Sequence, residues 1–399
     1  MRLGQFDKPI DAFTPVDFDA NGKAARLMAE QGSVLLKNEG AILPLQAPAL
    51  RSIALIGAAT FAGAAKLPST GPKGIITVNA RRTVTPLQGL QQVLATLGSK
   101  ASVTHDGGTD LARAQALAKR SDIAIVMAGD ISLEGEDRTD LSLPVRDGVD
   151  QDALIAAIAQ ANPRTVVVLK DGGPVLMPWL DRVPAVLEAW YPGQEDGIAV
   201  ANVLFGIVNP SGKLPVTFPK STAESVTASP EQWPGTMVQS VRTANYTERL
   251  AIGYRWYDAH GIAPLFAFGH GLSYTSFSIS ALKAPRKSDG RQPIAIQFTV
   301  QNTGKRAGAE VAQVYLGLPP STGEPPKRLV GFTKVQLEPG EKKTVRVIVD
   351  PAASNHPLGY WDTDTQKWLT AHGAYRIFVG ASAASTPLRA ALEVKSDPH

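Results

Sequence analysis

The most reactive grouping in the sequence is an acidic run at residues 133–140. It puts four carboxylates and one arginine into eight residues: Glu134, Glu136, Asp137, Arg138 and Asp140. The run follows an uninterrupted apolar stretch at 123–129, which predicts a buried parallel strand, and open α/β sheets place their chemistry at the carboxyl ends of such strands. Adjacent carboxylates repel one another, so a fold keeps them where they are solvated, paired or used. Spacing alone also fits a solvated acidic turn with Arg138 as its counter-ion.

A second candidate is the run WYPGQE at residues 190–195, which follows an apolar run and precedes a predicted helix. Aromatic rings beside polar groups suit sugars, which are apolar on one face and hydroxylated at the rim. Trp190 and Gln194 are therefore candidates for substrate binding. The alternative is a buried aromatic side chain, with Gln194 or Glu195 capping the next helix.

Other chemistries have little support in the sequence. The glycine-containing run at 57–66 lacks the spacing of a phosphate-binding loop. No two of the six histidines have the i,i+4 spacing of a helical zinc site, and there is no G-x-S-x-G elbow. The absence of cysteine excludes thiolate metal sites and a cysteine nucleophile. We therefore expect no metal and no cofactor.

The elements that would position the candidate residues alternate between strands and helices. Apolar runs at 53–57, 123–128, 165–169 and 185–190 read as strands, and the stretches between them at 22–32, 86–97, 109–119, 148–161 and 195–206 read as helices. Strands without polar alternation that are separated by helices indicate a mainly parallel sheet covered on both faces. The sequence therefore predicts an (α/β) sandwich.

The pattern changes along the second half of the chain. Short alternating strands are predicted at 294–300, 309–318, 343–349 and 374–379, with turn residues between them, as in an antiparallel β-sandwich. The expected fold class is α/β plus all-β. The expected organisation is a tail at 1–21, an α/β domain at 22–220, a connecting segment at 221–278 and a β-sandwich at 279–396.

Composition narrows the partners and the compartment. The net charge of +4 over 399 residues, without basic runs interleaved with aromatics, gives no support to nucleic-acid binding. No apolar run reaches the ~18–20 residues that span a bilayer, and the first residues lack the apolar core of a signal peptide. We expect no membrane association and, for the sequence as written, a cytoplasmic protein. An N-terminus further upstream would make it periplasmic or secreted.

Taken together and in order, these segments resemble glycoside hydrolase family 3, the β-glucosidase and β-xylosidase family. The matching motifs are GSVLLKNEGAILPL at 32–45, VTPLQGL at 84–90, the acidic motif, GGPV at 172–175, AWYPGQE at 189–195, NPSGKLP at 209–215, GYRWYD at 253–258 and FAFGHGLSY at 266–274. The resemblance implies an (α/β) sandwich domain followed by a fibronectin type III-like sandwich. It also implies retaining hydrolysis of β-linked glucosides, xylosides or oligosaccharides.

The resemblance places the acid/base of this reaction in the acidic motif. Glu134, just before Gly135-Glu136-Asp137-Arg138, matches the acid/base glutamate, and Glu136 is its rival. A general acid must be protonated before attack, so burial or neighbouring carboxylates should raise its pKa. We expect Arg138 to fix the loop by pairing with Asp137 or with a backbone carbonyl.

The sequence departs from the family in one large respect. The nucleophilic aspartate and most sugar-binding residues of the family belong to an N-terminal barrel of ~300 residues, and no Ser-Asp-Trp nucleophile element occurs here. Residues 2–7 resemble the end of that barrel domain. Smaller departures are Arg249, where the family commonly has glycine, and Lys170-Asp171, where a neutral Asn-Ser pair is usual.

Three readings follow from the missing nucleophile. The chain supplies the acid/base of a β-glycosidase and is inactive alone, with a separate barrel domain as partner. Alternatively it is a non-catalytic carbohydrate-binding or interaction module, in which Trp190, Trp256 and Tyr257 matter most. A third reading is a remnant whose exposed docking surface leads to aggregation or to a homodimer.

Overall fold

The N-terminal part of the chain is built on a six-stranded sheet in the computed structural model, which describes residues 16–58, 83–130 and 138–395. The strand order is β1-β6-β5-β4-β2-β3; β1 pairs antiparallel with β6 and the other neighbours are parallel. The strands are β1 (Val34–Asn38), β2 (Ser52–Ile56), β3 (Ser102–Asp106), β4 (Ile123–Gly129), β5 (Thr165–Lys170) and β6 (Ala185–Glu188). The expected mainly parallel sheet is confirmed.

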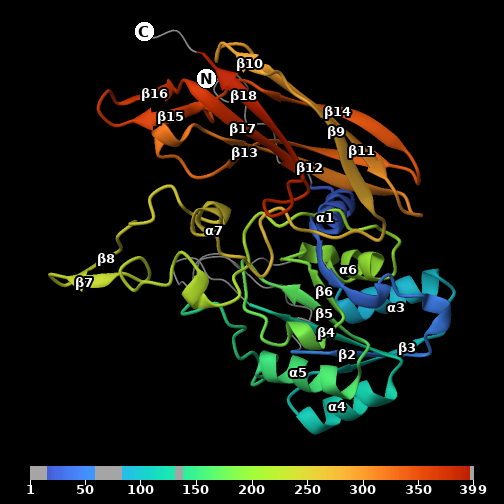
Figure 1. Cartoon of the computed structure of the whole chain (residues 1–399). Helices are drawn as coiled ribbons and strands as arrows, with labels where there is room; N and C mark the ends of the chain where they lie inside the picture. Colours follow the sequence, from blue (N-terminus) through green and yellow to red (C-terminus); the bar gives the residue numbers. More distant parts are fainter. Residues whose placement is uncertain (1–15, 59–82, 131–137, 396–399) are drawn as a thin grey trace, which may run out of the picture.

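Helices cover both faces of this sheet (Figure 1). They are α1 (Phe18–Gly32), α3 (Pro86–Thr96), α4 (Leu111–Arg120), α5 (Gln151–Ala161) and α6 (Asp196–Leu204). Side chains alternate along each strand. In β4, Ile125 and Met127 pack on the α3 and α6 side, whereas Val126 and Ala128 pack on the α4 and α5 side. Two apolar cores therefore flank a sheet that is buried throughout.

Short polar side chains set where the helices begin. Asp17 caps α1 by accepting from the backbone N–H of Asp19 and Ala20, so this helix starts at Phe18, earlier than expected. The residues from Phe18 on therefore belong to a helix and not to an irregular tail. Asp150 caps α5 in the same way, and this helix starts three residues later than predicted.

Helices α3 and α6 touch each other backbone to backbone. A Cβ atom at Gly89 would lie 2.0 Å from the carbonyl group of Gly197, and one at Gly197 would lie 1.9 Å from the carbonyl oxygen of Thr85. Any side chain at either position would force the helices apart. The two glycines are thus required by the packing of this layer.

The connecting segment wraps from the α/β domain to the β-sandwich. It contains the hairpin β7 (Thr236–Val238) and β8 (Val241–Thr243), which projects to one side in Figure 1, and the short helix α7 (Tyr254–His260). His270 Nε2 lies 2.9 Å from the carbonyl oxygen of Leu36 in β1, which ties the end of the segment to the sheet. Burial lowers the pKa of His270.

The C-terminal part is a β-sandwich of a five-stranded and a three-stranded sheet, ordered β10-β18-β17-β12-β13 and β14-β11-β9. The strands are β9 (Phe277–Lys283), β10 (Lys287–Ser288), β11 (Ile294–Asn302), β12 (Gly308–Gly317), β13 (Arg328–Leu337), β14 (Lys342–Val349), β17 (Gly373–Gly380) and β18 (Leu388–Val394), with a small hairpin of β15 (Gly359–Asp362) and β16 (Lys367–Thr370). Strictly alternating burial along β11 places its apolar side chains between the sheets. The expected sandwich is confirmed, with more strands than the four predicted.

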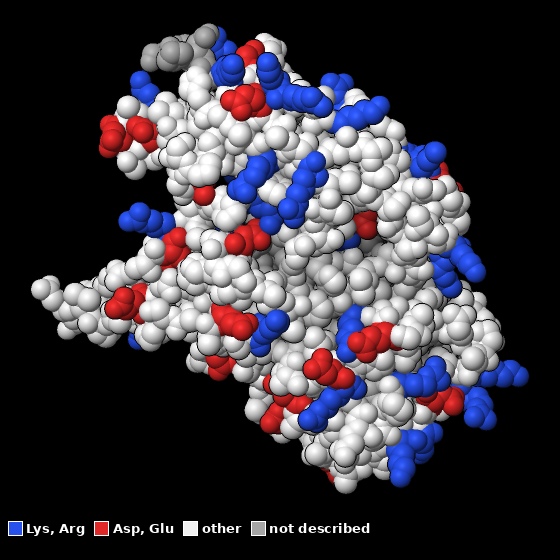
Figure 2. Space-filling model, viewed as in Figure 1, with Lys and Arg blue, Asp and Glu red and all other residues white. Residues whose placement is uncertain are grey.

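The surface carries charges of both signs. Figure 2 shows acidic and basic side chains interspersed on the face that it presents. Among the residues that the structure describes, no helix is both long and apolar enough to cross a membrane.

Candidate active site

The structure describes three of the predicted site residues: Arg138, Trp190 and Gln194. The acid/base candidate Glu134, its rival Glu136 and Asp137 lie outside the described residues. The residues on either side of them, Asp130 and Arg138, are described and mark where the chain enters and leaves the acidic segment.

Three carboxyl groups come together at the carboxyl edge of the sheet. Asp130 follows β4, Asp171 follows β5 and Glu188 ends β6, and these three strands are neighbours. Their side chains are fully or almost fully buried. Their meeting is not evident from the sequence; the available signal was an acidic residue at or just after the end of each of three apolar runs.

Arg138 binds the first of these carboxylates. Its Nη1 lies 2.9 Å from Asp130 Oδ2, and its Nη2 donates to the carbonyl oxygen of Pro174 at 2.8 Å. The carbonyl contact is one of the two kinds we expected. The carboxylate partner among the described residues is Asp130, which was not predicted from the sequence.

Asp171 and Glu188 form a second, different pair. Burial raises the pKa of Asp171 well above its usual value, and the charge of Asp130 adds to this. Burial likewise raises the pKa of Glu188, followed by the charge of Asp171. A hydrogen bond between the two side chains lowers the pKa of Asp171 and raises that of Glu188, and two carboxyl groups form such a bond only while one of them is protonated. We therefore expect this Asp171–Glu188 carboxyl pair to keep a proton to a higher pH than an isolated carboxyl group would.

This pair should make stability depend on pH. The folded-state pKa values are raised, so the stability that the pair contributes is fully present below about pH 4, the unfolded pKa range, and is lost as pH rises through the folded values. We expect Asp171→Asn to raise the free energy of unfolding by about 1–3 kcal/mol at pH 7.5, because the amide donates to Glu188 and removes one charge. The gain should shrink towards pH 4.5.

Urea unfolding at both pH values measures this effect. Asp122→Asn is the control, because hydrogen bonds from the backbone of Arg51 and Ser52 lower the pKa of Asp122. Both pH values lie above the usual pKa of an aspartate, so its effect should be a loss of stability of nearly the same size at pH 7.5 and at pH 4.5. A loss of stability in Asp171→Asn at pH 7.5 would contradict the shared proton.

A buried ion pair lies behind the carboxyl groups. Lys170 Nζ at the end of β5 donates to Asp196 Oδ2 at the start of α6, and both side chains are buried. Burial lowers the pKa of Lys170 and raises that of Asp196, while their mutual attraction opposes both shifts. The charge of Lys170 is thus engaged by Asp196 at the start of α6.

Trp190 packs against the protein on several sides. Its backbone has a positive φ of 57°, and its N–H donates to Glu188 Oε1 at 2.7 Å. The indole Nε1 donates to the carbonyl oxygen of Gly32 at 3.2 Å, and the ring lies 6.5 Å from that of Phe218 between centroids. The strand predicted to reach residue 190 ends at Glu188, two residues before this left-handed turn.

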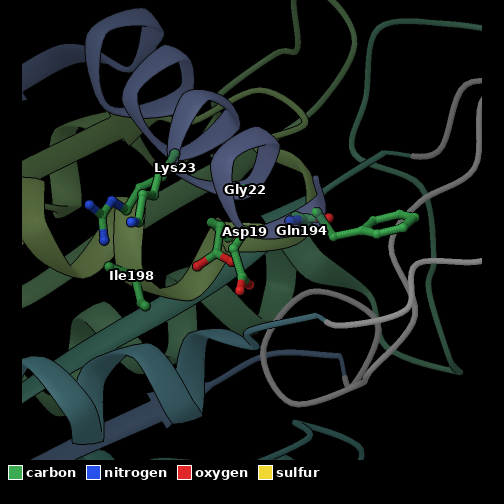
Figure 3. Close-up of a pocket in the computed structure, with 8 residues that line it drawn as sticks. Asp19, Gly22, Lys23, Gln194 and Ile198 are labelled. Atoms are coloured by element: carbon green, nitrogen blue, oxygen red, sulfur yellow. The ribbon is translucent and has the colours of Figure 1, made fainter. Parts of the chain in front are cut away.

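Gln194 lies in a pocket away from the carboxyl groups. The cavity has a volume of about 340 Å³. Figure 3 shows it between α1, which carries Asp19, Gly22 and Lys23, and the segment that carries Gln194 and Ile198. The side chain of Glu195 makes no capping hydrogen bond to α6. In the described part of the chain, no cluster of three or more His, Asp or Glu residues is arranged to hold a metal ion.

Comparison with known proteins identifies the two parts of the chain. Residues 33–274 match the glycosyl hydrolase family 3 C-terminal domain, and residues 310–383 match a fibronectin type III-like domain. Thermostable β-glucosidase B of Acetivibrio thermocellus is 38% identical over 396 residues, which cover 95% of this chain and 49% of that protein. β-Glucosidase B of Emericella nidulans is 42% identical over 284 residues, covering 68% of this chain and 32% of that protein.

Solved structures agree with this assignment. The structure of DesR, a β-glucosidase from Streptomyces venezuelae in complex with D-glucose, superposes with a TM-score of 0.86 at 32% identity, covering 98% of this chain and 63% of that one. β-Glucosidase 3B from Thermotoga neapolitana gives a TM-score of 0.79 at 30% identity, covering 95% and 55%. The chain thus spans about a third to two thirds of the length of these proteins. It belongs to glycoside hydrolase family 3 and matches the C-terminal portion of its members.

Proposed function

We propose that this chain supplies the acid/base of a retaining β-glucosidase, with Glu134 in that role. The observation that carries the proposal is the acidic motif Glu134-Gly135-Glu136-Asp137-Arg138 directly after β4, in a chain of this family. The carboxyl edge of a parallel sheet is where such chemistry is placed. In the retaining mechanism, Glu134 would protonate the leaving oxygen and then deprotonate the attacking water.

The nucleophile would come from the barrel half of the protein. No Ser-Asp-Trp element is present in these 399 residues, and the relatives that match are substantially longer. A carboxylate must stand about 5–5.5 Å from the acid/base in a retaining enzyme, so the barrel would dock against the carboxyl edge of the sheet. The barrel is carried either on the same longer polypeptide or on a separate chain. β-Glucosides are the proposed substrates, with β-xylosides as the close alternative.

The test is hydrolysis of aryl β-glucosides by the 399-residue chain, alone and mixed with the barrel half of the Acetivibrio thermocellus relative. We expect turnover only in the mixture. Glu134→Gln should lower kcat/KM at least about a hundredfold on glucosides with poor leaving groups, and much less on dinitrophenyl glucoside, which needs no protonation. Glu136→Gln is the matched control and should retain most of the activity.

Two outcomes would overturn parts of this proposal. Turnover by the chain alone that is lost in Glu134→Gln would show that the nucleophile lies within these residues. A loss confined to Glu136→Gln would move the acid/base role to that residue.

A further inference from the structure

The acidic segment that carries Glu134 is tied together at its two ends. It begins after Asp130 and ends before Arg138, and these two residues are bound to each other, with 2.9 Å between Oδ2 and Nη1. The side chain of Asp130 is 1% exposed and that of Arg138 25% exposed. We call this contact the Asp130–Arg138 clasp. An ion pair that is largely withdrawn from water is screened less than a surface ion pair.

Both halves of the clasp are fixed to the rigid sheet. Asp130 Oδ1 accepts from the backbone N–H of Gly172 at 2.9 Å and from the hydroxyl of Tyr191 at 2.6 Å. Arg138 donates to the carbonyl oxygen of Pro174. The clasp therefore joins the end of β4 to the segments that follow β5 and β6. The two carboxylate oxygens of Asp130 thus have different partners: Oδ2 pairs with Arg138, and Oδ1 accepts the hydrogen bonds that orient the carboxylate.

The charges around the clasp explain why residue 130 is a carboxylate. The charge of Arg138 also lowers the pKa of Asp171, and the charge of Asp171 in turn raises that of Glu188. Without Asp130, the guanidinium would be drawn to the Asp171–Glu188 pair instead of to the start of the acidic segment. Asp130 thus determines which carboxylate binds Arg138. It thereby also fixes the position of Arg138, the first described residue after the acidic segment.

We propose that Asp130 is the positioning residue for the acid/base: through Arg138 it sets the places at which the chain enters and leaves the segment that carries Glu134. It does not touch the substrate. The inference rests on the proposed function for its catalytic consequence, but the clasp itself is independent of any activity. A displacement of about 1 Å of a catalytic group costs on the order of a hundredfold in rate, so the fixed ends matter for kcat.

The first experiment follows the clasp in the chain alone. Trypsin must bind the side chain of Arg138 to cleave before Thr139, and the clasp withholds that side chain. We expect Asp130→Asn to accelerate this cleavage at least tenfold. Mass spectrometry of samples taken over time measures the cleavage rate, and the melting temperature of the variant shows whether it is folded. Asp122→Asn is the matched control, because Asp122 stands at the other end of β4 and also pairs with an arginine, Arg51. It should leave the cleavage rate unchanged.

The second experiment follows the reaction in the mixture with the barrel half. Asp130→Asn should lower kcat at least tenfold with KM within twofold, and Tyr191→Phe, which removes one hydrogen bond to Asp130, should cause a smaller loss of the same kind. The double variant Asp130→Asn/Arg138→Gln should lose no more than the worse single variant, because both act through one contact.

The outcomes separate this inference from the proposed function. Unchanged cleavage in Asp130→Asn overturns the clasp. Wild-type kcat in Asp130→Asn, while Glu134→Gln is inactive, overturns the positioning role alone. If Glu134→Gln retains full activity, the proposed function falls and the positioning role falls with it, whatever the proteolysis shows.

Discussion

Replacing Lys170 by methionine is expected to lower the free energy of unfolding by about 3–5 kcal/mol, because it leaves a buried carboxylate without its partner. Lys170 and Asp196 are 2% and 6% exposed. The second oxygen of Asp196, Oδ1, is buried and has no hydrogen-bond partner among the described residues, so no other described side chain takes the place of the lysine. Burial already raises the pKa of Asp196, and removal of the lysine would raise it further.

The size of this loss should depend on pH. A carboxyl group with a raised folded-state pKa contributes stability below its unfolded pKa and loses that contribution as pH rises. The variant should therefore be less destabilised at pH 5 than at pH 8, and urea unfolding at both values measures the difference. Lys343→Met is the control: its pair with Glu341 is half-exposed and screened by solvent, so the loss of stability should be much smaller. Equal losses in the two variants would refute the importance of the buried pair.

Gly129→Ala is expected to destabilise the protein by about 4 kcal/mol or more. A Cβ atom at this position would lie 1.9 Å from the carbonyl oxygen of Lys170, to which Gly129 is opposed in the β4–β5 register. The obstacle is backbone, so no side chain can turn away. Gln151 also brackets the glycine, accepting from its N–H at 2.9 Å and donating to its carbonyl oxygen at 2.8 Å. The strand cannot shift without breaking this pair.

A neighbouring glycine provides the control for this prediction. A Cβ atom at Gly173 would meet Arg138 Nη2 at 3.7 Å, which is an ordinary contact. Gly173→Ala should therefore change the free energy of unfolding by less than about 1 kcal/mol. Chemical denaturation of both variants measures their free energies of unfolding. A small effect of Gly129→Ala would contradict the prediction, because it would mean that β4 and β5 can separate at this position at little cost in free energy.

The central strands could be predicted from sequence because their apolar runs are uninterrupted. Residues 123–128 and 165–169 read as buried strands and are β4 and β5. The edge strand β3, with the sequence SVTHD, was missed because its side chains are polar or half-exposed. The strand β13 (RLVGFTKVQL) was missed because a glycine and several polar residues interrupt its apolar pattern. Edge and sandwich strands are stabilised by pairing, which local sequence does not reveal.

The candidate site was predictable in part for the same reason. The acidic motif is contiguous, so its residues could be named from sequence. The meeting of Asp130, Asp171 and Glu188 depends on the strand order β6-β5-β4, and the Lys170–Asp196 pair depends on where α6 begins. Such contacts link residues that are tens of positions apart, and only the packed sheet brings them together.

The contact between α3 and α6 has a consequence for how the structure opens. Because Gly89 and Gly197 leave no side chains between the two backbones, a movement of either helix away from the other breaks this direct contact. Local unfolding proceeds in contiguous cooperative units, so this layer should open as one unit. Since α6 begins at Asp196, the partner of Lys170, an opening of this layer would also uncover the charges at the end of β5. We therefore expect the α3–α6 layer and the carboxyl edge of the sheet to open with the same free energy of local unfolding.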